Sequence, residues 1–129
     1  MSSPTVAILV RTKGRPRFLS RALENIAQQT FTDYTVCVIN DGGDEQATRA
    51  VIEASPLGSS RVQLLTTAGG NMEAASNAGL AATTSTYVAI HDDDDLWAPE
   101  FLERTVAALE ESGALMCTTR VVERYERKN

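Results

Sequence analysis

Four consecutive carboxylates, Asp92 to Asp95, are the residues of this chain that most clearly suggest chemistry. Repulsion between neighbouring carboxylates raises carboxylate pKa values, and a bound divalent cation removes that cost. If the backbone stays extended through the run, Asp92 and Asp94 face one way, whereas Asp93 and Asp95 face the other. Two carboxylates on one side suit Mg²⁺ or Mn²⁺, whose remaining positions take water and phosphate oxygens. The run therefore predicts a divalent-metal site at Asp92 and Asp94.

An ordinary solvated loop is the alternative interpretation of the aspartate run. In that case one aspartate would favour the amino end of a helix that begins near Pro99, and Asp95 fits this role best. The run directly follows a short apolar stretch, residues 87–90, and this position favours a site. No cluster of Cys and His residues accompanies the aspartates, so we do not expect zinc.

The acidity of the chain is mostly this one local feature. The formal net charge is -5, and it would be -1 without the four aspartates. An acidic chain without a basic stripe argues against a nucleic-acid partner. The sequence has neither an apolar run long enough to span a membrane nor a signal-peptide pattern, so we expect a cytoplasmic protein. Cys37 and Cys117 lie in apolar runs and are expected to be buried free thiols, with a disulfide as the alternative.

The elements that position the aspartates alternate between short apolar runs and longer helical patterns. Strands are predicted at residues 5–10, 34–39, 62–65, 87–90 and 114–122. Helices are predicted from Pro16 to about residue 27, at residues 45–54 and 72–82, and from Pro99 to the stop at Gly113. Residues 56–60 are expected to form a loop and residues 123–129 a charged tail. This alternation predicts one α/β domain, residues 1–129, with a largely parallel sheet.

Polar residues gather at the carboxyl ends of three predicted strands. They occupy residues 11–15, 40–44 and 91–95. In parallel α/β sheets, ligands bind outside these strand ends, where the strand order reverses. The sequence therefore predicts one ligand site built from these three segments.

Five motifs occur in the same order as in a known family. They are Arg11-Thr12-Lys13-Gly14-Arg15-Pro16, Gln28-Gln29-Thr30-Phe31, Val38-Ile39-Asn40-Asp41-Gly42-Gly43, Asn77-Ala78-Gly79 and the stretch from Tyr87 to Pro99. They look like Pro-Thr-Tyr-Asn-Arg-Pro, Gln-Thr-Tyr/Phe, Val-Asp-Asp-Gly-Ser, Arg-Asn-Ala-Gly and the Asp-x-Asp stretch of the inverting family 2 glycosyltransferases. The chain resembles that family from Thr5 to about Leu109.

The resemblance implies a three-layer, Rossmann-like GT-A domain that binds a nucleotide sugar, incomplete and cut short after the fifth strand. Asp41 would accept a hydrogen bond from N3–H of a uracil-like base, and Thr12 would contact the base or ribose. Asp93 would touch the ribose. Asp94, with Asp92, would hold Mn²⁺ or Mg²⁺ on the diphosphate of a UDP-sugar donor. The metal would neutralise charge on the leaving nucleoside diphosphate.

Lys13, Arg15, Asn71 and Ser76 complete the nucleotide-binding set that the resemblance implies. Asn71 is also a candidate helix cap, and Lys13 would meet a phosphate or lie on the surface. Three residues depart from the family pattern: Lys13 replaces an aromatic residue, Asn40 an aspartate and Ser76 a basic residue. These departures weaken the assignment to uridine. Asp41 and Thr12 also suit ordinary turn positions.

His91, the only histidine, precedes the aspartates. A packed residue or a hydrogen-bond partner of Asp92 is the favoured interpretation, with a general base as the alternative. Inverting transfer needs a carboxylate to take the proton of the acceptor hydroxyl. The family carries that base in a second half, so no catalytic residue is assigned, and the acceptor is unknown.

Three interpretations of the short chain stay open: a truncated transferase, a donor-binding module that works with a partner chain, and a nucleotide- or metal-binding module without transfer activity. The first is favoured. A receiver-like signalling domain would need its acidic pair after the first strand, where this chain has Arg11, Thr12 and Lys13.

Overall fold

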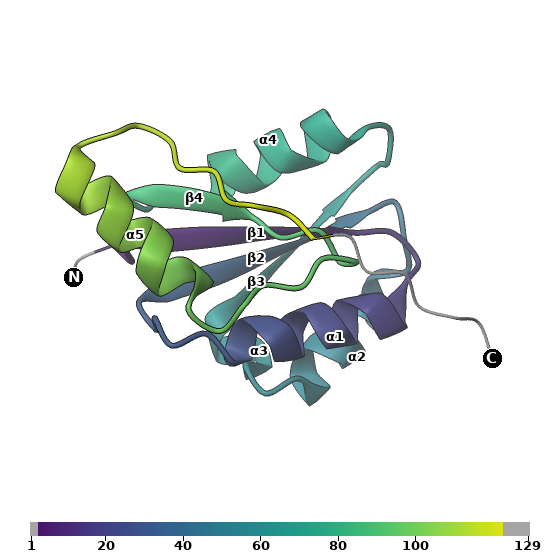
Figure 1. Ribbon diagram of the computed structural model, residues 1–129. Helices are drawn as coiled ribbons and strands as arrows, with labels where there is room; N and C mark the ends of the chain where they lie inside the picture. Colours follow the sequence, from purple (N-terminus) through teal and green to yellow (C-terminus); the bar gives the residue numbers. More distant parts are fainter. Residues whose placement is uncertain (1–2, 123–129) are drawn as a thin grey trace.

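A computed structural model describes residues 3–122 of the chain (Figure 1). The elements are β1 (Val6–Thr12), α1 (Pro16–Ala27), β2 (Tyr34–Asp41), α2 (Glu45–Ala54), α3 (Gly58–Arg61), β3 (Val62–Thr67), α4 (Met72–Ala82), β4 (Tyr87–Ile90) and α5 (Phe101–Ser112). Strand and helix alternate as the sequence predicts. The α/β class and the parallel sheet are confirmed.

The four strands form one parallel sheet in the order β3-β2-β1-β4. β1 lies between β2 and β4, with Val6 opposite Tyr34 on one side and Tyr87 on the other. The chain therefore builds outward from β1 in both directions, and the strand order reverses next to β1. In such sheets the crevice at this reversal, above the carboxyl ends of the strands, is the usual ligand site.

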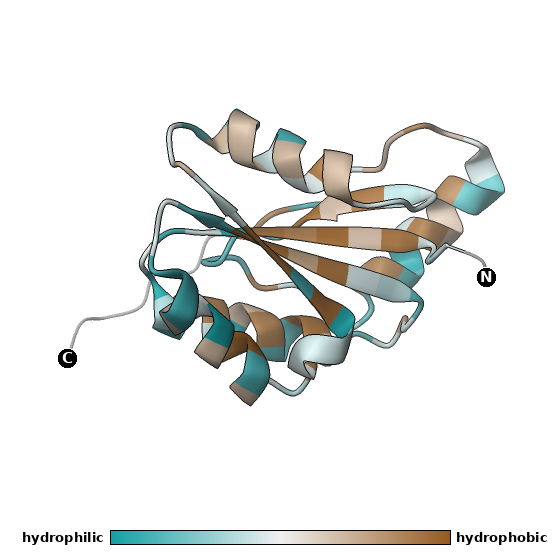
Figure 2. Cartoon of the chain, turned by 180° about the vertical axis from the view of Figure 1, so that it is seen from behind, coloured by the Kyte–Doolittle hydropathy of each residue, from teal (hydrophilic) through white to brown (hydrophobic). Residues whose placement is uncertain are grey.

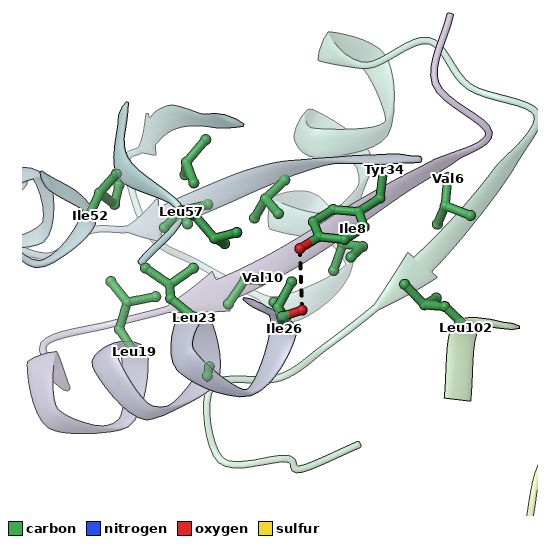
Figure 3. Close-up of a cluster of buried hydrophobic side chains, with 14 of the residues drawn as sticks. Val6, Ile8, Val10, Leu19, Leu23, Ile26, Tyr34, Ile52, Leu57 and Leu102 are labelled. Carbon is green, nitrogen blue, oxygen red and sulfur yellow. Dashed lines mark hydrogen bonds between the residues drawn. The ribbon is translucent and has the colours of Figure 1, made fainter. Parts of the chain in front are cut away.

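One face of the sheet carries the main core. Side chains of β1 and β2 pack there against α1, and Ile52 of α2 and Leu102 of α5 complete the cluster. Figure 3 shows these residues converging, with the hydroxyl of Tyr34 donating a hydrogen bond to the carbonyl oxygen of Ile26 at 3.2 Å. Because β1 and β2 are buried on both faces, they are nearly continuous apolar runs, which appear brown between the helical layers in Figure 2.

The opposite face is covered by α4 (Figure 1). A smaller core of Leu9, Cys37, Ile39 and Ala75 lies beneath this helix. Gly79 allows the close approach, because a Cβ there would lie 2.8 Å from Cδ1 of Ile39 and 3.2 Å from Cδ2 of Leu9. The loop between β3 and α4 leads into this helix, and the first residue of the helix, Met72, borders the site at the carboxyl ends of the strands.

Replacing Gly79 by valine should therefore destabilise the fold. The added side chain must displace Ile39 and Leu9, and overpacking of this kind costs roughly 1–3 kcal/mol. Ala81→Val is the matched control, because Ala81 lies exposed on the same helix and carries only the small helix penalty of a β-branched residue. Urea unfolding measures the free energy of unfolding of both variants. Equal losses in the two variants would contradict the close packing of α4 against Ile39 and Leu9 at Gly79.

Four expectations are wrong. Residues 114–122 form no strand; they are exposed, and within the described part of the chain β4 pairs only with β1. The predicted loop at residues 56–60 contains the start of α3, and α5 begins at Phe101 instead of Pro99. Cys117 is exposed, whereas Cys37 is a buried free thiol whose pKa burial raises to about 11.

In residues 3–122 no helix has the length and apolarity to cross a membrane.

Candidate functional site

The carboxyl ends of β1 and β4 border a cleft with a volume of about 410 Å³. Its walls come from the β1–α1 loop, from the turn after β4 and from the first residue of α4. The lining residues are Arg11, Thr12, Lys13, Arg15, Met72, Asp92, Asp93 and Asp94. Cations and carboxylates thus face each other at the point where the strand order reverses.

The aspartate run does not continue the strand. The backbone turns at Asp93 and Asp94, and the amide of Asp95 donates to the carbonyl oxygen of Asp92 at 3.0 Å. Because of this turn, Asp92, Asp94 and Asp95 each offer a carboxylate oxygen, and these oxygens lie within 4.8 Å of one another. The strict alternation assumed from the sequence is wrong, although Asp92 and Asp94 still come together.

Asp95 belongs with these carboxylates and does not serve the following helix. Its Oδ2 accepts a hydrogen bond from the amide of Asp92 at 3.4 Å. The residue before α5 is Glu100, and no side chain caps that helix. The expectation that Asp95 supports the amino end of the helix near Pro99 is therefore wrong, because the tight turn brings its carboxylate to Asp92 instead.

Asp93 is separated from the other three aspartates by its partners. It is 4% exposed, and its Oδ2 accepts from the Thr12 hydroxyl at 3.0 Å and from Nε of Arg15 at 3.1 Å. Nη2 of Arg15 pairs with Oδ1 of Asp93, and the hydrogen bonds to this carboxylate raise the pKa of Arg15. Asp93 therefore ties the loop after β1 to the turn after β4.

The pKa of Asp92 is raised by its position in the aspartate cluster. Burial raises the pKa of Asp92, and the charge of Asp95 raises it further, while Arg11 opposes the shift. A divalent cation would relieve both causes, since it replaces lost hydration and neutralises the neighbouring charge. Three carboxylates also match the hard oxygen ligands that Mg²⁺ and Mn²⁺ prefer. The residues present fit such an ion.

His91 contacts the backbone of the aspartate turn and does not line the cleft. The ring is fully buried, with Nδ1 2.7 Å from the carbonyl oxygen of Asp92 and Nε2 2.9 Å from Oδ1 of Asn25. Asn25 also accepts from the amide of Trp97 and donates to its carbonyl oxygen. Burial lowers the pKa of His91. The structure therefore places His91 as a packed residue, in contact with Asp92 through the backbone.

Asp41 lies at the carboxyl end of β2 with a 5% exposed side chain. Its Oδ1 accepts from the Thr67 hydroxyl at 2.7 Å, and its Oδ2 lies 4.0 Å from Nη1 of Arg11. Arg11 in turn lines the cleft. The carboxylate expected to meet the base is thus joined to the aspartate cleft through one arginine.

The remaining predicted nucleotide contacts divide into two groups. Thr12, Lys13, Arg15 and Asp93 line the cleft together. Asn71 and Ser76 do not line it; Oδ1 of Asn71 accepts from the amide of Ala74 at 2.7 Å and caps α4. Arg11 and Asp95 lie in the segments expected to build the site, but neither was among the residues predicted to contact the nucleotide or the metal. The signal for Arg11 was a charged residue ending an apolar run, residues 6–10.

Comparison with known proteins gives consistent matches. A family model described as Glycosyl transferase family 2 matches residues 7–129. An uncharacterized glycosyltransferase of Nostoc sp. is 27% identical over 107 residues, which are 83% of this chain and 33% of that protein. Chondroitin synthase of Pasteurella multocida is 26% identical over 114 residues, which are 88% of this chain and 12% of the synthase. The chain thus spans a third or less of the length of these relatives.

Solved structures share the fold. The mannosyltransferase PcManGT from Pyrobaculum calidifontis, in complex with GDP-Man and Mn²⁺, matches with a TM-score of 0.71 at 26% identity, covering 84% of this chain and 33% of that chain. S. aureus TarS 1–349 in complex with UDP-GlcNAc matches with a TM-score of 0.73 at 19% identity, covering 84% of this chain and 32% of TarS. The expected GT-A fold is confirmed.

Proposed function

Because the chain belongs to glycosyl transferase family 2, we propose that it binds the nucleotide-sugar donor of a metal-dependent glycosyltransferase. The observation that carries the proposal is the group of Asp92, Asp94 and Asp95 at the reversal of strand order, opposite the cations of the β1–α1 loop. A diphosphate bound to a divalent ion has both kinds of charge that this cleft would complement. The relative solved with GDP-Man and Mn²⁺ supports the same class of ligand.

The residues of the proposed site then have distinct chemical roles. Asp92 and Asp94, with Asp95, would hold Mn²⁺ or Mg²⁺, and this ion would supply charge neutralisation at the leaving diphosphate. Asp41 would accept a hydrogen bond from the base, Thr12 would contact the base or ribose, and Asp93 would contact the ribose. Lys13 and Arg15 lie on the opposite wall, where cations stabilise phosphate oxygens.

The geometry of the Arg15 pair adds preorganisation to this binding. The β1–α1 loop is tied to the aspartate turn before any donor arrives, through the bonds of Thr12 and Arg15 to Asp93. Binding therefore need not order that loop, which lowers its entropic cost. Transfer to an acceptor hydroxyl with inversion is proposed from the family resemblance, and none of the described residues is assigned as its base.

Thermal unfolding with and without metal tests the donor-binding proposal. UDP or GDP with Mn²⁺ should raise the melting temperature, since a ligand at one hundred times its Kd stabilises the fold by about 2.7 kcal/mol. The same nucleotides in EDTA should give a much smaller shift, and Mn²⁺ alone provides the baseline. Equal shifts with Mn²⁺ and with EDTA would contradict the proposed role of the aspartates.

A further inference from the structure

Arg11 lies between Asp41 and the aspartate cleft, and the proposed function gives it no role in metal binding. It follows the apolar run of β1 and lies opposite Ile39 in the sheet. Because side chains alternate along a strand, Arg11 shares the α4 side with Leu9, and Asp41 shares it with Ile39. The two charged residues are therefore neighbours on the same face, at the carboxyl ends of adjacent strands.

Neither side chain has its hydrogen-bonding capacity filled by the other. Nη1 of Arg11 lies 4.0 Å from Oδ2 of Asp41, which is too far for a direct hydrogen bond. Nε of Arg11 is buried without a hydrogen-bond partner. The Thr67 hydroxyl occupies Oδ1 of Asp41 and leaves Oδ2 facing the arginine. A strong donor thus stands beside a strong acceptor, and no direct hydrogen bond joins the two side chains.

Glycines border this pair on the side of the β3–α4 loop. Gly42 follows Asp41 with φ of 84°, and Gly69 has φ of 88°. The two loops meet closely, because a Cβ on Gly42 would lie 3.3 Å from Cα of Gly69. The two loops therefore pack directly against each other beside Asp41, where glycine at both positions allows the positive φ and the close approach.

We propose that Arg11 and Asp41 together read one edge of the nucleobase, with Asp41 accepting from a ring N–H and Arg11 donating to the adjacent carbonyl oxygen. This inference rests on the proposed function and adds Arg11 as a specificity-determining residue. Uracil, thymine and guanine have a ring N–H beside a carbonyl. Cytosine and adenine instead place a ring-nitrogen lone pair beside an amino group, so the carboxylate would face a lone pair and the guanidinium an N–H.

Calorimetric titration in Mn²⁺ of UDP, CDP and inorganic pyrophosphate tests this selectivity. The unsubstituted chain should bind UDP roughly tenfold or more tightly than CDP, as is typical for a paired donor and acceptor on a base edge. Arg11→Met keeps the aliphatic length and removes the donors; it should weaken UDP binding and bring the ratio of UDP to CDP affinity towards one. Pyrophosphate affinity should fall by less than UDP affinity, because pyrophosphate presents no base edge to Arg11.

Lys13→Met is the matched control, since it removes a cation from the same cleft without touching Asp41. It should weaken UDP and CDP equally and preserve their ratio. Arg11→Lys keeps the charge and one donor, and should retain part of the selectivity. Unchanged melting temperatures would show that each variant is folded.

Three results would overturn the inference alone, while metal-dependent nucleotide binding persists. They are equal affinity of the unsubstituted chain for UDP and CDP, an unchanged ratio in Arg11→Met, and a loss of pyrophosphate binding as large as the loss of UDP binding. The last result would make Arg11 a phosphate ligand. Absence of nucleotide binding at any metal concentration would contradict the proposed function and this inference together.

Discussion

Replacing Asp94 by alanine should abolish the part of nucleotide binding that depends on metal. Asp94 is exposed to the cleft and offers a carboxylate oxygen within 4.8 Å of those of Asp92 and Asp95. In the proposed metal site, loss of one of the three carboxylates would remove both a coordination bond and a negative charge. We expect the affinity for UDP in Mn²⁺ to fall at least about a hundredfold and to approach the value in EDTA, measured by calorimetry; coupling energies between ligands of this kind reach that size.

The matched control is Glu53→Ala, which removes an exposed carboxylate from α2. It changes the net charge equally but leaves the cleft intact, so the affinity should stay the same. Asp94→Asn separates charge from shape, since the amide oxygen is a weaker ligand, and should give an intermediate loss. If Asp94→Ala kept its metal-dependent affinity, Asp92 and Asp95 would carry the ion without it, and the three-carboxylate site would be incorrect.

Asp93→Ala should destabilise the fold without any ligand, whereas the same change at Asp95 should not. Asp93 is buried and accepts from Thr12 and Arg15, and its removal leaves the buried Thr12 hydroxyl without that partner. Hydrogen bonds to charged groups contribute roughly 1.5–3 kcal/mol. The Arg15 side chain is 41% exposed, so solvent screening reduces its share, and we expect a loss of about 1–3 kcal/mol in the free energy of unfolding.

Asp95→Ala is the control from the same turn. Asp95 is exposed and raises the pKa of Asp92, so its removal relieves repulsion and should leave stability equal or slightly higher. Urea unfolding in EDTA compares the two variants directly. Equal losses would show that the turn depends on every aspartate alike, and would contradict the separation of Asp93 from the other three.

The strand ends that form the site could be predicted from the sequence. Buried parallel strands are short apolar runs, and the first polar residues after them must lie at one edge of the sheet. This logic correctly placed Thr12 at the carboxyl end of β1 and Asp41 at the carboxyl end of β2. It also placed Asp92 in the segment that follows β4. It needed only local periodicity.

Pairing between distant side chains could not be predicted in this way. Arg15 and Asp93 are 78 positions apart, and His91 and Asn25 are 66 apart, so no local pattern links them. The direction of Asp93 depends on such contacts, because Thr12 and Arg15 hold its carboxylate. Extending the strand alternation through Asp95 therefore gave the wrong reason for joining Asp92 to Asp94.

The apolar run of residues 114–122 shows a different limit. Its composition suits a strand, yet a strand forms only when another edge supplies hydrogen-bond partners. In the described part of the chain these residues pair with no strand, and Leu115 is fully exposed. Composition predicted a tendency, and tertiary pairing decided the outcome.

Calorimetric titration of the chain with UDP, once in Mn²⁺ and once in EDTA, tests the central claim most directly. The carboxylate group of Asp92, Asp94 and Asp95 predicts saturable one-site binding in Mn²⁺ and an affinity in EDTA that is at least about tenfold lower. Equal affinity in the two buffers would contradict a metal-bridged donor site at the aspartate turn.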